Sequence, residues 1–269
     1  MADAARSPGR LEVFQTLREG LTLLPLAIGP FFIADVLALG LMSILVSLLD
    51  LPFTILNRVL EVGGLGAASP GALPVARDIM GWVLQAFVVL WLLVAHYRIA
   101  AEVRTGLKPE FPDVFFKHYP PLLPLASLVL VLGLGTLMGF SALVVPGVVF
   151  LLVFGQALPA MIFEGTNVRG SLAASWRLTP GNILSLLGLT LILLLLAFVP
   201  SFLSYLVAKA VGPGASLFIV LPTVTVAIVL LFALSCLPAL VAVIVYQNLR
   251  AQVAGSIPAE QPETEGVPA

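Results

Sequence analysis

Charged residues are scarce in this chain. Asp, Glu, Lys and Arg make up 10% of its 269 residues, whereas an ordinary soluble domain carries roughly 25%. Hydrophobic residues make up 60% of the chain, which is too much apolar surface to cover with polar groups in water. The formal net charge is −1, so no strong attraction to nucleic acid is expected. The composition therefore predicts a protein whose main solvent is lipid.

Cysteine and histidine are also rare, and the usual catalytic motifs are missing. Because Cys236 is the only cysteine, the chain cannot form an internal disulfide. The two histidines, His96 and His118, lie in one basic region that we interpret as a solvated loop. The sequence contains no Gly-x-Ser-x-Gly, His-Glu-x-x-His or Cys-x-x-Cys motif. We therefore expect no enzyme activity, no catalytic or metal-binding residues and no cofactor.

What the chain does contain is long apolar runs. A helix needs about 20 residues to cross a hydrocarbon layer about 30 Å thick. The apolar runs cover residues 21–49, 79–97, 122–163, 183–208 and 216–249. The third run is long enough for two crossings, with Val145-Pro146-Gly147 as the turn between them. The sequence thus predicts an all-α, polytopic integral membrane helix bundle with about six transmembrane helices.

The first run is too long for a signal-peptide core of about 7–15 residues, and we interpret it as an uncleaved first span. Pro222 and Pro238 should kink the last run, which is either one tilted span or a partly re-entrant segment. Residues 51–78 are rich in glycine and proline and are expected to form a flexible loop. The predicted organisation is an N-terminal cytoplasmic segment with an interfacial helix (1–20), a six-span membrane domain (21–250) and a disordered cytoplasmic tail (251–269).

The distribution of basic residues predicts the orientation. Ten of the thirteen Lys and Arg residues fall on one side of the predicted membrane, and they are Arg6, Arg10, Arg18, Arg98, Arg104, Lys108, Lys117, Arg169, Arg177 and Arg250. The other side holds Arg58, Arg77 and Lys209. Short loops rich in Lys and Arg stay in the cytoplasm. Both termini are therefore expected to be cytoplasmic.

Three short segments on this basic side share an amphipathic pattern. Their apolar residues are spaced by three and four positions, and the segments are 11–19, 111–117 and 171–177. Gly20, Pro120-Pro121 and Pro180-Gly181 follow them as helix breakers. Such segments suit interfacial helices in the headgroup layer. The chain can be described as three units, each an interfacial helix followed by a hairpin of two spans. The repetition results either from duplication or from the general need of multispanning proteins for short amphipathic connecting helices.

The stretch from Val145 to Gly188 resembles a known family. Its matching features are Val145-Pro146-Gly147, Leu158-Pro159-Ala160, Glu164-Gly165, Ser175-Trp176-Arg177-Leu178-Thr179 and Gly181. The ending Tyr246-Gln247-Asn248-Leu249-Arg250 fits the same pattern. These features resemble the membrane domain of bacterial glycerophosphoryl diester phosphodiesterases and related inner-membrane proteins. The resemblance implies a membrane fold in the bacterial plasma (inner) membrane. It does not imply the phosphodiesterase activity, which belongs to a separate soluble barrel.

Five polar residues are candidates for function or for structural support. Asp35, Gln85 and Gln156 fall inside predicted spans, where polar groups usually face the bundle interior. No Lys or Arg lies in another span, so Asp35 is expected to contact Gln85, Gln156, a hydroxyl or water. Glu164 is expected to pair with Arg169 or Arg177, or to cap the next helix. Arg177 is interpreted as a cytoplasmic anchor.

Two functional hypotheses follow. The first is a non-enzymatic membrane scaffold or lipid-interacting factor, since the spans carry few polar residues and basic residues lie near the headgroups. The alternative is a transporter or permease subunit that uses Asp35. Membrane lipids are the expected partners. Gly135-x-x-x-Gly139 permits a close helix contact, either within one chain or with a second copy or another membrane protein.

Overall fold

A computed structural model of the chain describes residues 11–62, 72–116, 120–211 and 217–256. These residues form nine helices, and no strand occurs among them. The helices are α1 (Val13–Val62), α2 (Ala72–Arg104), α3 (Phe111–Phe116), α4 (Leu122–Ala142), α5 (Val144–Phe154), α6 (Ala157–Glu164), α7 (Val168–Leu178), α8 (Ile183–Val211) and α9 (Leu217–Ser256).

The helices confirm the all-α membrane fold. Five helical segments in the described part of the chain are long and apolar enough to cross a bilayer. A sixth is obtained if Val168–Leu178 and Ile183–Leu196, which meet at an angle of 103°, count as one bent span. The protein is thus a multi-pass membrane protein, with five or six candidate spans among the residues that the structure describes.

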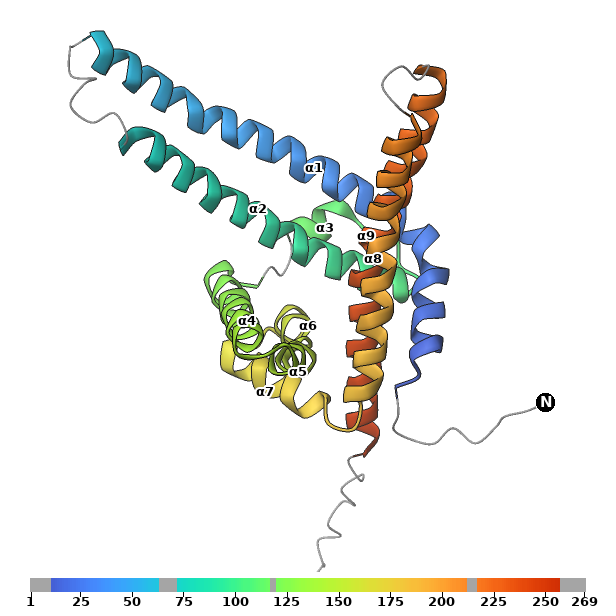
Figure 1. Ribbon diagram of the computed structural model, residues 1–269. Helices are drawn as coiled ribbons and strands as arrows, with labels where there is room; N and C mark the ends of the chain where they lie inside the picture. The colour runs from blue at the N-terminus through green and yellow to red at the C-terminus, as the bar shows by residue number, and fades with distance from the viewer. Residues whose placement is uncertain (1–10, 63–71, 117–119, 212–216, 257–269) are drawn as a thin grey trace, which may run out of the picture.

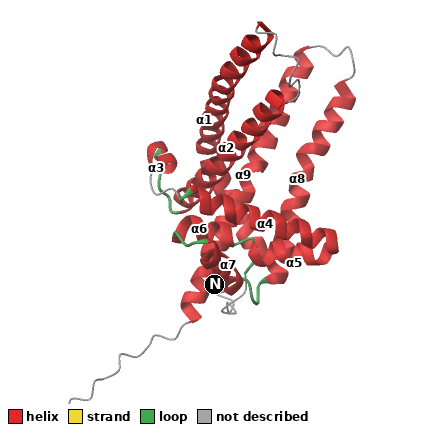
Figure 2. Cartoon of the chain, turned by 90° about the vertical axis from the view of Figure 1, so that its left-hand side faces the viewer, coloured by secondary structure: helices red, strands yellow, loops and turns green. Residues whose placement is uncertain are grey.

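The chain is built from three helical hairpins. α1 packs against α2, α4 packs against α5, and α8 packs against α9. Figure 1 shows the α1–α2 hairpin running diagonally away from α8 and α9, while α4 and α5 are seen nearly end-on. In Figure 2 α4 and α5 lie across the foot of the other two hairpins. The hairpins therefore point in three directions from a common foot.

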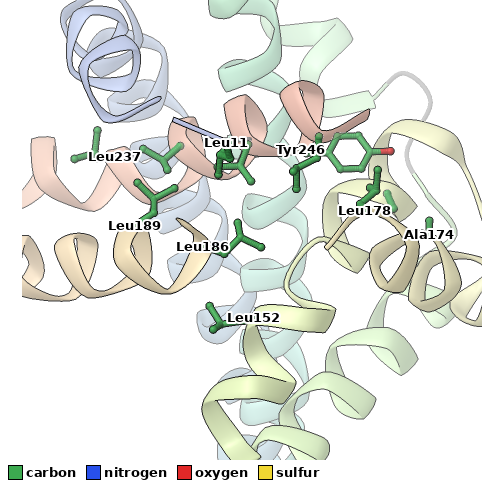
Figure 3. Close-up of a cluster of buried hydrophobic side chains, with 12 residues drawn as sticks. Leu11, Leu152, Ala174, Leu178, Leu186, Leu189, Leu237 and Tyr246 are labelled. Carbon is green, nitrogen blue, oxygen red and sulfur yellow. The ribbon is translucent and has the colours of Figure 1, made fainter. Parts of the chain in front are cut away.

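The buried core lies at this foot, which we call the base. The base comprises the N-terminal part of α1, the C-terminal parts of α2 and α9, the beginning of α8, and helices α6 and α7. One buried cluster joins Leu11, Leu178, Leu186, Leu237 and Tyr246 from four separate segments (Figure 3). Burying such side chains stabilises the base because each fully buried Leu contributes about 2 kcal/mol in water.

The outer halves of the hairpins bury far less. Large apolar side chains there are mostly exposed, and examples are Leu51, Val59, Leu137, Leu143, Leu195 and Phe202. Exposed apolar groups along helices of this length belong in a bilayer, where lipid tails cover them. The outer halves of the hairpins thus differ from the base, because their apolar side chains lack protein neighbours that would cover them.

Helix α1 differs from the prediction at both ends. It runs without a break from Val13 to Val62, so Gly20 does not end an interfacial helix. A methyl group added at Gly20 would lie 3.1 Å from Val241, which shows that this glycine allows α1 to approach α9 closely. Instead, α1 changes direction within its length (Figure 1). Pro25 and Pro30 lie inside this helix, and a proline there removes a helical hydrogen bond.

At its far end α1 continues through residues that were expected to form a flexible loop. Residues 51–62 are helical, and α2 begins at Ala72. Pro52 lies inside α1, which a helix in lipid tolerates because neighbouring groups satisfy the freed backbone carbonyl. The remaining part of that predicted loop, residues 63–71, lies outside the described residues.

The α4–α5 hairpin confirms two crossings in residues 122–163 but moves the turn. Leu143 is extended, with φ −167°, and separates α4 from α5. Val145-Pro146-Gly147 is therefore not the turn but the first turn of α5, where proline is tolerated. Gly139 faces Gly147, because a methyl group added at Gly139 would lie only 2.6 Å from the Gly147 Cα. The close helix contact of Gly135-x-x-x-Gly139 is thus made within one chain.

The remaining segments match the prediction in part. α3 and α7 are separate short helices at two of the three predicted interfacial positions, although the side chain of Phe115 lies outside the described ones. α9 is one continuous helix rather than a re-entrant segment, and it extends to Ser256, into the predicted tail. Residues 257–269 lie outside the described residues.

Candidate functional site

Arg104 joins three helices at the base. Its Nε donates to Glu19 Oε1 at 2.7 Å, its Nη1 to Gln247 Oε1 at 2.7 Å, and its Nη2 to Asn248 Oδ1 at 2.7 Å. The Arg104 side chain is 17% exposed, so these charge-assisted bonds are partly shielded from water. We call these four residues the Arg104 lock. The lock fixes the C-terminal end of α2 to α1 and to α9.

Glu164 forms a second tie between the base helices. Tyr246 donates its hydroxyl hydrogen to Glu164 Oε1, and the Nε of Arg250 lies 3.6 Å from the same oxygen. The Tyr246 ring is buried among the base leucines and its hydroxyl points out of them (Figure 3). The expected partners of Glu164, Arg169 and Arg177, are therefore wrong. The contact with Tyr246 gives Glu164 a structural role, because it joins α6 to α9.

Ser175 and Thr179 provide hydrogen-bond donors for a backbone carbonyl at the C-terminal end of α5. Their hydroxyls donate to the backbone oxygen of Val153 at 2.6 and 3.1 Å. This carbonyl lies in the last turn of α5, where helical partners run out. Thr179 therefore ends α7 and does not cap α8, which begins at Ile183. Gly165 has φ 63° and ends α6 in the left-handed conformation, which glycine adopts without strain.

Gln156 lies at the break between α5 and α6. It is 8% exposed, and among the described residues no group donates to its side-chain oxygen. Gln156 packs beside the α4–α6 cluster that contains Ala157 and is not one of the residues around Asp35. The expectation that Gln156 contacts Asp35 is therefore wrong.

Asn182 is a residue that the sequence did not single out. Its Oδ1 accepts from the backbone N–H of Leu11 at 2.8 Å, and its Nδ2 lies 3.3 Å from Gln252 Oε1. Asn182 is 4% exposed. It lies in the same stretch that resembles the membrane domain family, directly after Gly181. That position was the one signal that pointed to it.

Arg177 and Trp176 point outward from α7. Both are exposed, with Trp176 61% exposed, whereas Ser171 and Ser175 on the opposite face are buried. An outward Trp and Arg at the end of a membrane domain suit the headgroup layer. The role of Arg177 as a cytoplasmic anchor stays a prediction.

Asp35 pairs with His96. The Asp35 Oδ1 lies 3.0 Å from His96 Nε2, and the two side chains are 24% and 20% exposed. Phe31 packs edge-on against the imidazole, with ring centroids 4.7 Å apart. His96 lies inside α2, so its interpretation as a solvated loop histidine is wrong. His118, the other histidine, lies outside the described residues.

A cavity of about 390 Å³ opens beside this pair. Its described lining residues come from α1, α2 and α9, and they are Phe32, Asp35, Val36, Ala38, Leu39, Met42, Gln85, Val88, Val89, Leu92 and Phe232. The structure thus brings Asp35 and Gln85 to one cavity. Helical spacing in the sequence could have indicated this arrangement. Gln85 and His96, the partner of Asp35, are three turns apart and lie on the same face of α2.

Comparisons of the chain with protein-family models, with curated proteins and with solved structures find no match. The resemblance to the phosphodiesterase membrane domain therefore stays a prediction. The residues that carry it have a physical explanation in the fold, because Glu164, Ser175, Thr179, Tyr246 and Arg250 all form ties within the base. The pair Asp35–His96 lies outside those stretches and forms the candidate site.

Asp35→Asn should preserve the fold, whereas Asp35→Leu should destabilise it. An asparagine can still accept a hydrogen bond from His96, but leucine leaves the imidazole without this partner at a cost of about 1–3 kcal/mol. The measurement is the thermal unfolding of purified protein in detergent. Unfolding is detected by the reaction of a fluorogenic maleimide with Cys236, because this thiol is the only one in the chain and is buried in the folded protein. Equal stability of both variants would contradict the structural importance of the pair.

Proposed function

We propose that the chain is a non-enzymatic multispanning membrane protein that interacts with lipids and serves as a membrane scaffold. The observation that carries this proposal is the divergence of three apolar hairpins from one base (Figures 1 and 2). Such an arrangement offers more surface to lipid than a compact bundle of the same helices. The polar ties of the base hold helices together and leave the hairpin flanks apolar.

The outward face of α7 adds a headgroup contact. Arg169, Trp176 and Arg177 are all exposed on this helix. Each basic residue close to an anionic surface contributes about 1 kcal/mol of attraction, and the indole ring favours the interfacial layer. In a lipid-interacting protein these residues would bind headgroups. A solute pathway through the chain would give them no such role.

We further propose that the protein resides in a bacterial inner membrane with both termini in the cytoplasm. The residues at the base support this orientation, because the predicted cytoplasmic arginines Arg104, Arg169, Arg177 and Arg250 all belong to it or flank it. The resemblance to bacterial inner-membrane proteins supports the location. Another membrane protein or a second copy of the chain remains open as a partner.

A reporter enzyme that is active only outside the cytoplasm tests the orientation. Fused after Gly66, between α1 and α2, the reporter should be active. Fused after Arg104, Gly170 or Gln252, it should be silent, because these positions carry the basic residues that hold loops inside. Activity of the fusion after Arg104 would contradict the orientation.

The lipid role is tested by depleting the protein in its host cell. We expect an altered distribution of phospholipids between the leaflets, measured with a headgroup-reactive reagent, and an unchanged uptake of small solutes. Re-expression of the chain should restore the lipid distribution, and a variant that lacks the exposed face of α7 (Arg169→Ser, Trp176→Ser, Arg177→Ser) should restore less. An unchanged lipid distribution would contradict the proposal.

The second candidate is a transporter or permease subunit. The specific observation that favours it is the Asp35–His96 pair, because ionisable groups inside membrane helices often mark substrate or proton pathways. In this case depletion should change solute uptake and leave the lipid distribution unchanged. The same experiment therefore separates the two functions.

A further inference from the structure

The α1–α2 hairpin carries a groove between two polar ties. Near the base, Asp35 pairs with His96, and further out Asp50 accepts from the Nε of Arg77 at 2.7 Å. The groove is the cavity beside Asp35, and a separate cavity of about 560 Å³ lies further out. The second is lined by apolar residues of the same two helices, and they are Leu45, Leu48, Leu49, Met80, Val83, Leu84 and Phe87.

The dimensions of the groove fit one lipid tail. From Phe32 to Met42, the lining residues at its two ends on α1, the helix rises about 15 Å, which is similar to the roughly 15 Å depth of one bilayer leaflet. The cavity beside Asp35 falls at the lower end of the about 300–1,000 Å³ range of small-molecule sites. It therefore suits a single tail better than a double-tailed lipid.

The groove opens sideways to the bilayer. Its rim residues Phe32, Leu39 and Val89 are 56%, 68% and 55% exposed, and residues exposed on this part of the hairpin face lipid tails. An occupant can thus enter laterally from the membrane without crossing a polar layer.

The polar end of the groove selects the chemistry of the occupant. Of the described lining residues, only Asp35 and Gln85 are polar, and no Lys, Arg or His is among them. His96 is absent from this lining and holds the Asp35 carboxylate through its Oδ1. A carboxylate accepts hydrogen bonds and attracts cations, so it favours a head that donates and disfavours an anionic head.

We propose that this groove binds a single-tailed amphiphile whose head is an amine or another uncharged or cationic hydrogen-bond donor. The head contacts the Asp35 carboxylate and the tail lies between α1 and α2 toward Met42. This inference rests on the proposed lipid-interacting function and names the class of lipid that the protein takes.

The test uses the full chain, purified and reconstituted in phosphatidylcholine vesicles, and two photoreactive probes. One probe is a long-chain amine with a diazirine in its tail, and the other is the fatty acid with the same tail. We expect the amine to label peptides 32–42 and 80–92 in preference to the fatty acid. Equal labelling by both probes would overturn the selectivity of the Asp35 end.

Two variants locate the site. Asp35→Asn removes the negative charge but keeps the bond to His96, so amine labelling should fall about tenfold, the effect of one lost charge-assisted contact. Val89→Trp should block the groove for both probes. Its matched control is Val149→Trp on α5, a similarly exposed valine (45%) outside the groove, which should label like the original protein. Unchanged labelling in Val89→Trp would overturn the inference.

The readouts separate this inference from the proposed function. Selective amine labelling combined with an unchanged cellular lipid distribution would contradict the proposed function alone. Absent labelling combined with an altered lipid distribution would contradict this inference alone. Thermal unfolding followed at Cys236 confirms that each variant is folded before labelling is compared.

Discussion

Replacing Arg104 with methionine should destabilise the protein by about 3 kcal/mol, because removing one partner of a shielded ion pair leaves the other charge uncompensated. Here Glu19 loses its cation, and the side-chain oxygens of Gln247 and Asn248 lose their donors at the same time. The three helices α1, α2 and α9 then share only apolar contacts at this point. The measurement is the midpoint temperature of thermal unfolding in detergent, which is detected by the labelling of Cys236.

Two further variants test whether geometry or charge matters at Arg104. Arg104→Lys keeps the charge, but a lysine ammonium lacks the planar fork that reaches several acceptors, so its stability should fall between those of the original and Arg104→Met. Lys108→Met removes an exposed cation nearby and should change stability by less than about 0.5 kcal/mol. An equal loss in Lys108→Met would show that charge on this face, rather than the lock, supports the base.

Gly139→Ala should separate the α4–α5 hairpin at a cost of about 2–3 kcal/mol. The added methyl group would lie 2.6 Å from the Cα of Gly147 and 2.8 Å from its backbone nitrogen. Backbone atoms cannot rotate out of the way as a flexible side chain can, so α5 must shift as a whole. The same unfolding measurement should report the loss.

Gly133→Ala is the matched control on the same helix. A methyl group at Gly133 meets nothing within 4 Å, and alanine favours a helix over glycine by about 1 kcal/mol. This variant should therefore be as stable as the original or slightly more stable. If Gly139→Ala behaves like Gly133→Ala, the close approach of α4 and α5 is not required for folding.

The membrane fold was predictable because it depends on the lengths of apolar runs. The ends of the helices were less predictable, because glycine and proline do not stop a helix in lipid as they do in water. Gly20 provides room for Val241, and Pro30 and Pro52 lie inside α1. Whether a helix continues through such a glycine or proline depends on contacts with the neighbouring helix, and the local sequence does not reveal those contacts.

The candidate site was predictable in part. Asp35 stood out because it is ionisable and lies in mid-span, and its cavity partner Gln85 was named with it. Its partner His96 was misplaced because the basic residues that follow it suggested a loop, although they continue α2 to Arg104. Glu164 shows the same limit, since Tyr246 lies 82 positions further along the chain and cannot be found by local spacing.

The divergence of the hairpins makes the base a mechanical fulcrum. α2 has 33 residues, so its far end lies about 50 Å from Arg104. A tilt of about 10° at the base would move that end by about 9 Å, which is how small adjustments of packed elements become large displacements. A force on the outer end of α2 would therefore act on the Arg104 lock with the leverage of the whole helix.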